Sequence, residues 1–140
     1  MKGYLLDVNL LIALAWPNHA HHAKAHAWFA KERSAGWGTC AVAQIAFVRI
    51  SSHPAVEHHV TTQEALQKLR EIVALPGHSF WVEPANGYSN NEFVKTLANT
   101  LTHSLVTDGY LATVAACHDG KLATLDRQLV RIFGDLAVAI

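Results

Sequence analysis

Short apolar runs alternate along the chain with longer segments in which apolar residues recur every three or four positions. The short runs have the length of buried strands and end at polar or turn residues. They predict strands over 3–7, 79–84, 121–126 and 136–140. The longer segments have the spacing of amphipathic helices. They predict helices over 9–15, 21–33, 41–50, 61–75, 91–104, 107–120 and 127–135.

Several residues mark where these elements begin and end. Gly36 and Gly38 are expected to break the second helix. Thr61 with Glu64 three residues later fits a capping box, which predicts a helix that begins after Thr61. Thr107 is the expected N-cap of the helix that carries the last long apolar stretch.

The alternation of strands and helices predicts a three-layer α/β/α fold around a central, mostly parallel sheet. No linker or repeat divides residues 1–140, so one domain is expected. Hydrophobic residues make up 51% of the chain and charged residues 16%, which argues against disorder. No uninterrupted apolar run of membrane-spanning length occurs, so we expect a soluble cytoplasmic protein with no membrane partner. Its two cysteines are expected to stay reduced.

Three aspartates fall where a parallel sheet gathers its ligands. Asp7 and Asp126 stand at the ends of predicted strands, and Asp108 stands in the first turn of a predicted helix. Each alone is more typical of a turn or a helix cap. Together they would repel one another at the carboxyl edge of the sheet unless a cation neutralised them. Mg²⁺, a hard cation that prefers oxygen ligands, suits such a site.

The segments around these aspartates resemble a known family. "LLDVN", "VTDGYLATVA" and "LATLDRQL" are similar to the three acidic motifs of PIN-domain ribonucleases, and "TCAVAQIAFVRISSHP" is similar to the second motif of VapC-type toxins. The resemblance spans essentially the whole chain. It implies a PIN fold, Mg²⁺-dependent endoribonuclease activity in which Mn²⁺ can substitute, a homodimer, and a small VapB-like antitoxin as partner.

The resemblance also implies roles for individual residues. Asp7 and Asp108 match the principal metal ligands, and Asp126 matches the later acidic position, which binds metal directly or through water. Asn9 matches the polar residue that orients the first carboxylate. Thr124 matches a hydroxyl found just before the last acid, although a plain strand residue is an equally good interpretation.

Gln44 departs from the family, which usually has glutamate at this position. An amide supplies an oxygen without a charge, so weaker metal binding is expected, above all for a second ion. Formal net charge is zero, so bulk electrostatics do not attract RNA. Arg49 and Arg127 are the best candidates for contacts with phosphate, although a solvated surface arginine is the default interpretation.

Two other functional classes stay open. Gln44 favours a catalytically weak PIN domain that binds RNA or an antitoxin as a regulatory module. A small phosphatase or a response-regulator-like receiver fits less well, because the chain lacks a suitable mid-chain phospho-acceptor aspartate and the later strand-end lysine. Among the ten histidines, His22 and His26 have the i, i+4 spacing of metal ligands, but exposed polar-face residues are the expected interpretation.

Overall fold

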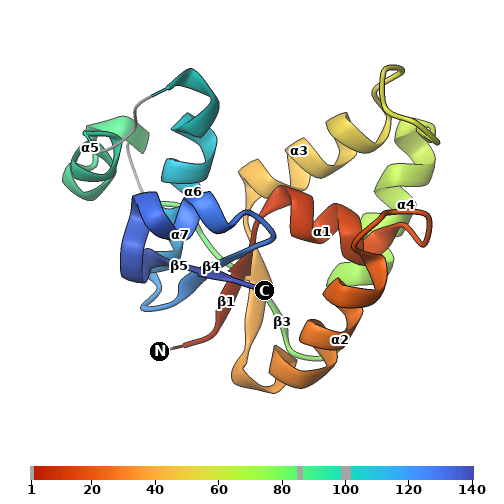
Figure 1. Ribbon diagram of the computed structural model, residues 1–140, viewed down its shortest axis with the longest axis horizontal. Helices are drawn as coiled ribbons and strands as arrows, with labels where there is room; N and C mark the ends of the chain where they lie inside the picture. Colours follow the sequence, from red (N-terminus) through yellow and green to blue (C-terminus); the bar gives the residue numbers. More distant parts are fainter. Residues whose placement is uncertain (1, 85–86, 99–101) are drawn as a thin grey trace.

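The computed structural model describes residues 2–84, 87–98 and 102–140. Within these ranges, five short strands form a single sheet in the order β3-β2-β1-β4-β5 (Figure 1). Every neighbouring pair is parallel, which confirms the predicted sheet and makes it entirely parallel. The strands are β1 (Tyr4–Leu6), β2 (Trp37–Thr39), β3 (His78–Phe80), β4 (Lys121–Thr124) and β5 (Ala137–Ala139).

The predicted helices are all present, with shifted ends. They are α1 (Val8–Ala15), α2 (His22–Glu32), α3 (Ala41–Ser51), α4 (Thr62–Val73), α5 (Asn91–Leu97), α6 (Val106–Cys117) and α7 (Arg127–Phe133). The helix expected over 91–104 is shorter, because α5 ends at Leu97 and residues 99–101 lie outside the described ranges. Within the described ranges, no helix combines the length and the hydropathy that a membrane span requires.

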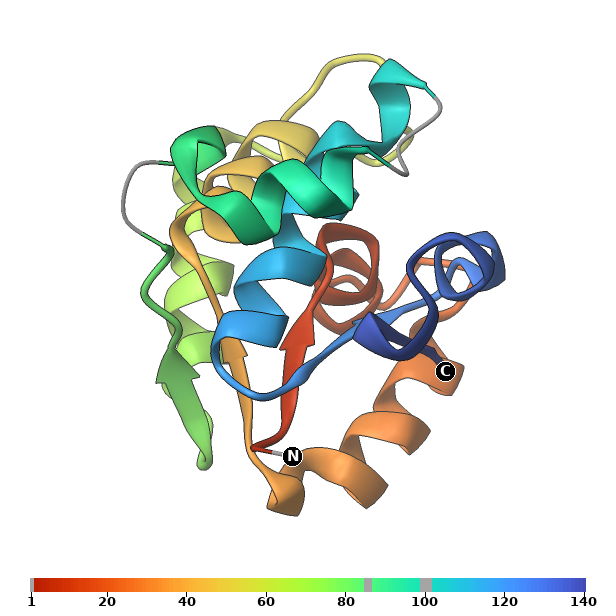
Figure 2. The ribbon, with the colours of Figure 1, turned by 90° about the vertical axis from the view of Figure 1, so that its left-hand side faces the viewer.

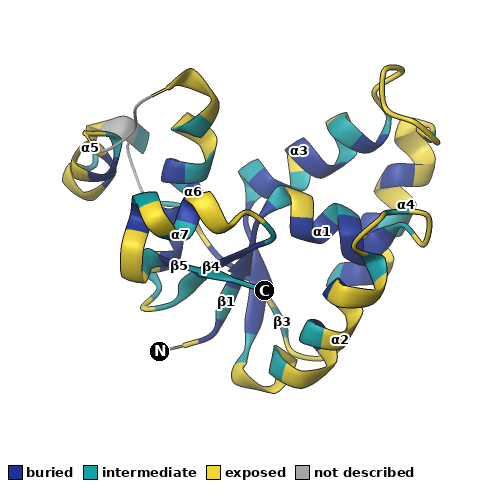
Figure 3. Cartoon of the chain, in the orientation of Figure 1, coloured by how far each residue is buried: buried dark blue, intermediate teal, exposed yellow. Residues whose placement is uncertain are grey.

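Alternating side chains on the central strands divide the core into two halves, one on each face of the sheet. Leu6 and Ala123 pack with α1, α2, α3 and α4, whereas Leu5 and Leu122 pack with α6 and α7. Figure 1 shows these two groups of helices on opposite sides of the sheet, and Figure 3 shows that their buried faces turn toward it. The period-two alternation of strand side chains therefore builds the three layers.

The strand β2 was missing from the sequence-based prediction, which treated its glycine only as a helix breaker. Gly38 lies within β2, and a Cβ atom there would meet the Trp81 indole at 2.3 Å. Glycine therefore allows the indole of Trp81 to pack directly against the strand. A glycine inside a strand marks such a close approach, but its partner is far away in the sequence.

One predicted helix cap is confirmed and another is wrong. Thr61 accepts a hydrogen bond from the Glu64 N–H at 3.0 Å and caps α4. Thr107, however, lies inside α6, which begins at Val106 and has no side-chain cap. A short 3-10 helix, His103–Leu105, runs directly into α6, so the backbone is already helical before Thr107.

The register of the two central strands positions the candidate site. Leu6 pairs with Ala123, and the Asp7 N–H donates to the Ala123 carbonyl at 3.0 Å. Figure 2 shows α6 lying over the central strand β1. The residues that follow β1 and β4 therefore meet at one edge of the sheet, beside the helix that carries Asp108.

Candidate active site

Asp7 occupies the turn between β1 and α1. The strand ends at Leu6 and the helix begins at Val8, so Asp7 is the N-cap residue of α1. Its Oδ1 atom accepts a hydrogen bond from the Leu10 N–H at 2.7 Å. Its side chain is buried, with 3% exposure, although carboxylates are rarely buried without a charged partner.

Asp126 caps the helix that follows β4. Its carboxylate accepts a hydrogen bond from the Gln128 N–H at 2.8 Å, and its side chain is exposed. The Asp126 N–H donates to the Thr124 hydroxyl oxygen at 3.0 Å. Thr124 is fully buried and also donates a hydrogen bond to the Asp7 carboxylate. A single threonine therefore connects two of the three aspartates.

Asp108 approaches from the other helical layer. It lies in the first turn of α6 and is partly buried. The positive end of the helix dipole favours its ionised form there. Burial has the opposite effect and dominates, so the pKa of Asp108 rises to about 6, with repulsion from Asp126 as the second cause.

The three carboxylates act on one another electrostatically. Burial raises the pKa of Asp7 to about 6, and repulsion from Asp108 and Asp126 contributes to this rise. Hydrogen bonds from Thr124 and from the Leu10 N–H oppose it. The structure thus brings Asp7, Asp108 and Asp126, here called the acidic cluster, into one site where full ionisation is unfavourable.

The acidic cluster fits a hydrated magnesium ion in its chemistry. Its donors are carboxylate oxygens, and a cation would remove the repulsion that raises their pKa values. Among the described residues, no three His, Cys, Asp or Glu side chains stand close enough to enclose an ion. Mg²⁺ usually keeps several waters and takes only one or two carboxylates, so it does not need a closed cage.

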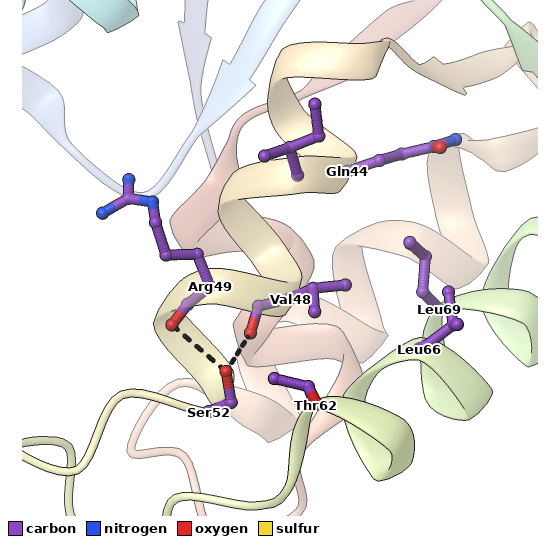
Figure 4. Close-up of a pocket in the computed structure, with 8 residues that line it drawn as sticks. Gln44, Val48, Arg49, Ser52, Thr62, Leu66 and Leu69 are labelled. Carbon is purple, nitrogen blue, oxygen red and sulfur yellow. Dashed lines mark hydrogen bonds between the residues drawn. The ribbon is translucent and has the colours of Figure 1, made fainter.

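Gln44 engages a different set of residues. Its amide Nε2 donates to the Thr39 hydroxyl at 2.9 Å, and Thr39 is also hydrogen-bonded to His78 Nε2 at 2.8 Å. Figure 4 shows that Gln44 and Arg49 project from opposite sides of α3. The hydrogen bond of Gln44 is therefore to a strand threonine and not to an aspartate.

The remaining predicted site residues are exposed. Asn9 lies in the first turn of α1, two residues after Asp7, and Arg127 begins α7 directly after Asp126. Arg49 lies on the outer face of α3. Within the described ranges, neither arginine forms an ion pair with a carboxylate, so both guanidinium groups remain available.

Glu83 is a site-supporting residue that the sequence did not reveal. Its carboxylate accepts hydrogen bonds from the Val42 N–H at 2.8 Å and from the Tyr110 hydroxyl at 3.0 Å. It thereby caps α3 and holds α6, the helix of Asp108, in place. Burial and the adjacent Glu83 raise the pKa of Tyr110 to about 12. No sequence motif marks this role, because the three elements meet only in the fold.

A mostly apolar groove lies between α3 and α4 (Figure 4). Its volume is about 590 Å³, and its walls include the exposed side chains of Ile45 and Leu66. Ile45 is 67% exposed, which is costly for a side chain of that size in water. The groove adjoins Gln44 and Arg49 and offers an apolar surface next to them.

Comparison with known proteins shows extensive sequence similarity to bacterial ribonucleases. The chain is 40% identical over 126 residues to "Ribonuclease VapC39" of Mycobacterium tuberculosis, and the match covers 89% of both chains. It is 36% identical over 136 residues to "Ribonuclease VapC29" of the same species, covering 97% of this chain and 95% of the relative. A search against protein-family models gave no match.

Solved structures show the same fold at lower identity. The chain is similar to VapBC2 from Rickettsia felis, in a structure bound to a promoter DNA fragment, with a TM-score of 0.68 and 12% identity. This match covers 98% of the chain and 96% of that structure. FitAcB from Neisseria gonorrhoeae matches with a TM-score of 0.64 and 17% identity, covering 98% and 96%. These likenesses establish the three-layer fold.

Proposed function

The chain belongs to the VapC ribonuclease family, and we propose that it is a Mg²⁺-dependent endoribonuclease that acts as the toxin of a toxin–antitoxin pair. One observation carries the metal dependence. Asp7 and Asp108 both have pKa values of about 6, because burial and mutual repulsion disfavour their charged forms. Burial and repulsion disfavour the ionised carboxylates of this site. A divalent cation that binds there relieves this repulsion, so its binding is favourable.

In this proposal Asp7 and Asp108 hold Mg²⁺, or Mn²⁺ in its place, and Asp126 contributes directly or through water. When bound, the ion supplies Lewis-acid polarisation of the phosphoryl oxygen and lowers the pKa of a water nucleophile. Hydrogen bonds from Thr124 and from the Leu10 N–H hold the Asp7 carboxylate in place. Glu83 fixes the helix that presents Asp108.

RNA binding needs a local source of positive charge, because the formal net charge of the chain is zero. The metal ion supplies part of it. Arg127 adjoins Asp126 at the start of α7, and Arg49 projects from the side of α3 opposite Gln44. We assign these two arginines to phosphate contacts, since guanidinium groups bind phosphate bidentately.

The partner in this proposal is a VapB-like antitoxin. The structural neighbours VapBC2 and FitAcB carry the names of two-component complexes, and VapBC2 is bound to promoter DNA. A basic antitoxin segment that placed an arginine or lysine at the acidic cluster would pair with its carboxylates and compete with metal and RNA. Antitoxin binding should then weaken in an Asp7→Asn/Asp108→Asn variant, and the loss relative to wild type should be largest at low salt, where the charge pairing is least screened.

We also propose that the toxin is a cytoplasmic homodimer. The exposed apolar side chains of Ile45 and Leu66, at the groove between α3 and α4, form a surface that a second chain could bury. Light scattering coupled to size exclusion gives the oligomeric state directly. An Ile45→Glu variant that stays dimeric would place the dimer contact elsewhere.

The decisive experiment is cleavage of defined tRNA and rRNA substrates with and without Mg²⁺. Asp7→Asn should abolish cleavage, because asparagine preserves the cap on α1 but removes the ligand charge. Asp135→Asn is the matched control, since Asp135 is an exposed aspartate in the turn before β5. Cleavage that survives in Asp7→Asn, or that proceeds equally in EDTA, contradicts the proposal.

A second candidate function is a catalytically weak PIN domain that binds RNA or an antitoxin as a regulatory module. Gln44 favours it, because its neutral amide is committed to Thr39 and adds no charge to the acidic cluster. On this alternative, wild-type protein and Asp7→Asn would bind RNA equally well and neither would cleave it.

A further inference from the structure

His22 and His26 stand one turn apart on α2 and face the end of α1. His22 Nδ1 lies 2.7 Å from the Ala13 carbonyl oxygen, and His26 Nε2 lies 2.9 Å from the Leu14 carbonyl oxygen. Both carbonyls belong to the last turn of α1, where backbone oxygens have no partner within the helix. The two histidines therefore cap the carboxyl end of α1 with their side chains.

These hydrogen bonds fix the tautomer of each ring. A carbonyl oxygen only accepts, so Nδ1 of His22 and Nε2 of His26 must carry the protons. In the neutral rings, His22 Nε2 and His26 Nδ1 then keep their lone pairs. Histidines that bind metals usually donate their other N–H in this way, often to a backbone carbonyl, which sets ring orientation and raises ligand basicity.

The two rings are also close enough to share an ion. Their centroids are 4.2 Å apart, with an angle of 55° between the ring planes. Two imidazoles bound tetrahedrally to one zinc ion at about 2.0–2.1 Å would have centroids roughly 5.2 Å apart. The pair must therefore open by about 1 Å to share the ion.

The surroundings add charge that favours a cation. The carboxyl end of α1 carries the negative end of its dipole. Glu71 lines the same cavity of about 320 Å³, between α2 and α4. Lys68 lines it too, and its ammonium group lies 3.3 Å from a Glu71 carboxylate oxygen. Lys68 therefore opposes a bound cation, and its effect is partly cancelled by Glu71.

We propose that His22 and His26 form a binding site for a borderline transition-metal ion, of which Zn²⁺ is the probe, separate from the acidic cluster. Imidazole nitrogens suit Zn²⁺ and Ni²⁺, whereas the carboxylates of the acidic cluster suit Mg²⁺. The site has two protein nitrogens, since no three potential ligands come together within the described ranges. Water completes the coordination, and Glu71, which lines the same cavity, contributes negative charge nearby.

A bound ion at this site would stabilise one arrangement of helices. Its ligands come from α2, their hydrogen bonds end on α1, and Glu71 belongs to α4. The ion would strengthen the polarisation of both N–H groups against the α1 carbonyls. We therefore expect zinc to raise the melting temperature of the full chain.

Isothermal titration of the full chain with Zn²⁺ tests this proposal. His22→Gln and His26→Gln retain an N–H donor for the α1 carbonyls but replace the imidazole ligand with a poor one. Each should weaken zinc binding by about a hundredfold, the lower end of the gain that two linked binding groups give over one. Lys68→Gln should tighten binding, and Glu71→Gln should weaken it.

Two controls separate this site from others. His59→Gln changes an exposed histidine that also lies 3.1 Å from a backbone carbonyl, that of Val56, and it should leave zinc affinity unchanged. Asp7→Asn disrupts the acidic cluster, and it should leave this zinc site intact. The proposal is overturned if His22→Gln and His26→Gln bind zinc as tightly as wild type. It is also overturned if Asp7→Asn removes all zinc binding.

Discussion

The Thr124 hydroxyl donates a hydrogen bond to the buried carboxylate of Asp7, and its oxygen accepts one from the Asp126 N–H at 3.0 Å. This arrangement connects the end of β1 with the start of α7 through one side chain. It also favours the charged form of Asp7, because a donated hydrogen bond stabilises an anion more than a neutral acid. Thr124 is therefore a positioning residue with an electrostatic effect.

Replacing Thr124 with valine should remove this support at nearly constant volume. The pKa of Asp7 should rise above its present value of about 6, since burial and repulsion are then less opposed. Mn²⁺ affinity at pH 6.5 should fall by about tenfold, as expected for loss of one hydrogen bond to a charged group. Titration calorimetry measures this, with Thr124→Ser as the variant that keeps the hydroxyl. If both variants bind Mn²⁺ with equal affinity, the Thr124 hydroxyl does not support the metal site.

The metal-free protein should become more stable when Asp7 is replaced by asparagine. The pKa of Asp7 is about 6 in the folded chain, whereas a solvated aspartate has a pKa of 3.8, so ionisation favours the unfolded chain above pH 3.8. The gain in Asp7→Asn should be complete above pH 6, at roughly 3 kcal/mol, and should vanish as pH falls to 3.8. Urea unfolding in EDTA at pH 7.5 and pH 4 measures the difference. An asparagine variant less stable than wild type at pH 7.5 contradicts the burial argument.

Metal binding should depend steeply on pH near 6. Protons compete with the ion for Asp7 and Asp108, whose pKa values are both about 6. Apparent Mn²⁺ affinity should be constant above pH 7 and fall below pH 6, by up to about tenfold per pH unit for each proton displaced. The two groups interact, so the titration will report the pair rather than either residue. A flat profile between pH 5 and 8 would show that these carboxylates do not bind the ion.

Gln44→Glu should act first on the network that Gln44 contacts. A carboxylate cannot donate to Thr39, so the Thr39 hydroxyl must turn toward the new group and His78 must supply an N–H. Burial lowers the pKa of His78, and the added charge should raise it again. We expect the pKa of His78, measured by NMR, to increase, melting temperature to fall slightly and Mn²⁺ affinity to change less than about threefold. If Mn²⁺ binding instead becomes tenfold tighter while the pKa of His78 is unchanged, residue 44 lies at the metal, as the family resemblance implies.

Much of the fold follows from local patterns in the sequence. The strand β1 ends where "YLL" meets Asp7, and α4 begins where Thr61 can cap it, because apolar period and capping chemistry operate over a few residues. The alternation of strands and helices then leaves a parallel sheet as the natural arrangement, and membership of the VapC family agrees with it.

Other features depend on residues that are distant in the sequence. The strand β2 has only three residues and contains Gly38, so its local sequence does not predict a strand. It forms because it pairs with β1 and β3 and because the Trp81 indole packs against Gly38. Glu83 acquires its role only when the starts of α3 and α6 approach one another. The sequence pattern of His22 and His26 is typical of surface residues, and only the packing of α2 against the end of α1 gives them partners.

The sequence by itself determined that three aspartates would follow strands or begin a helix, since a short strand and an amphipathic helix are each encoded locally. Only the tertiary structure determined how strongly those aspartates repel one another and how far their pKa values rise. Asp7 became a buried acid with a pKa of about 6 because Leu6 pairs with Ala123, which sets Thr124 beside it, and because α6 brings Asp108 from the opposite layer. Burial and electrostatic repulsion depend on distances through space, and only the packed chain fixes those distances.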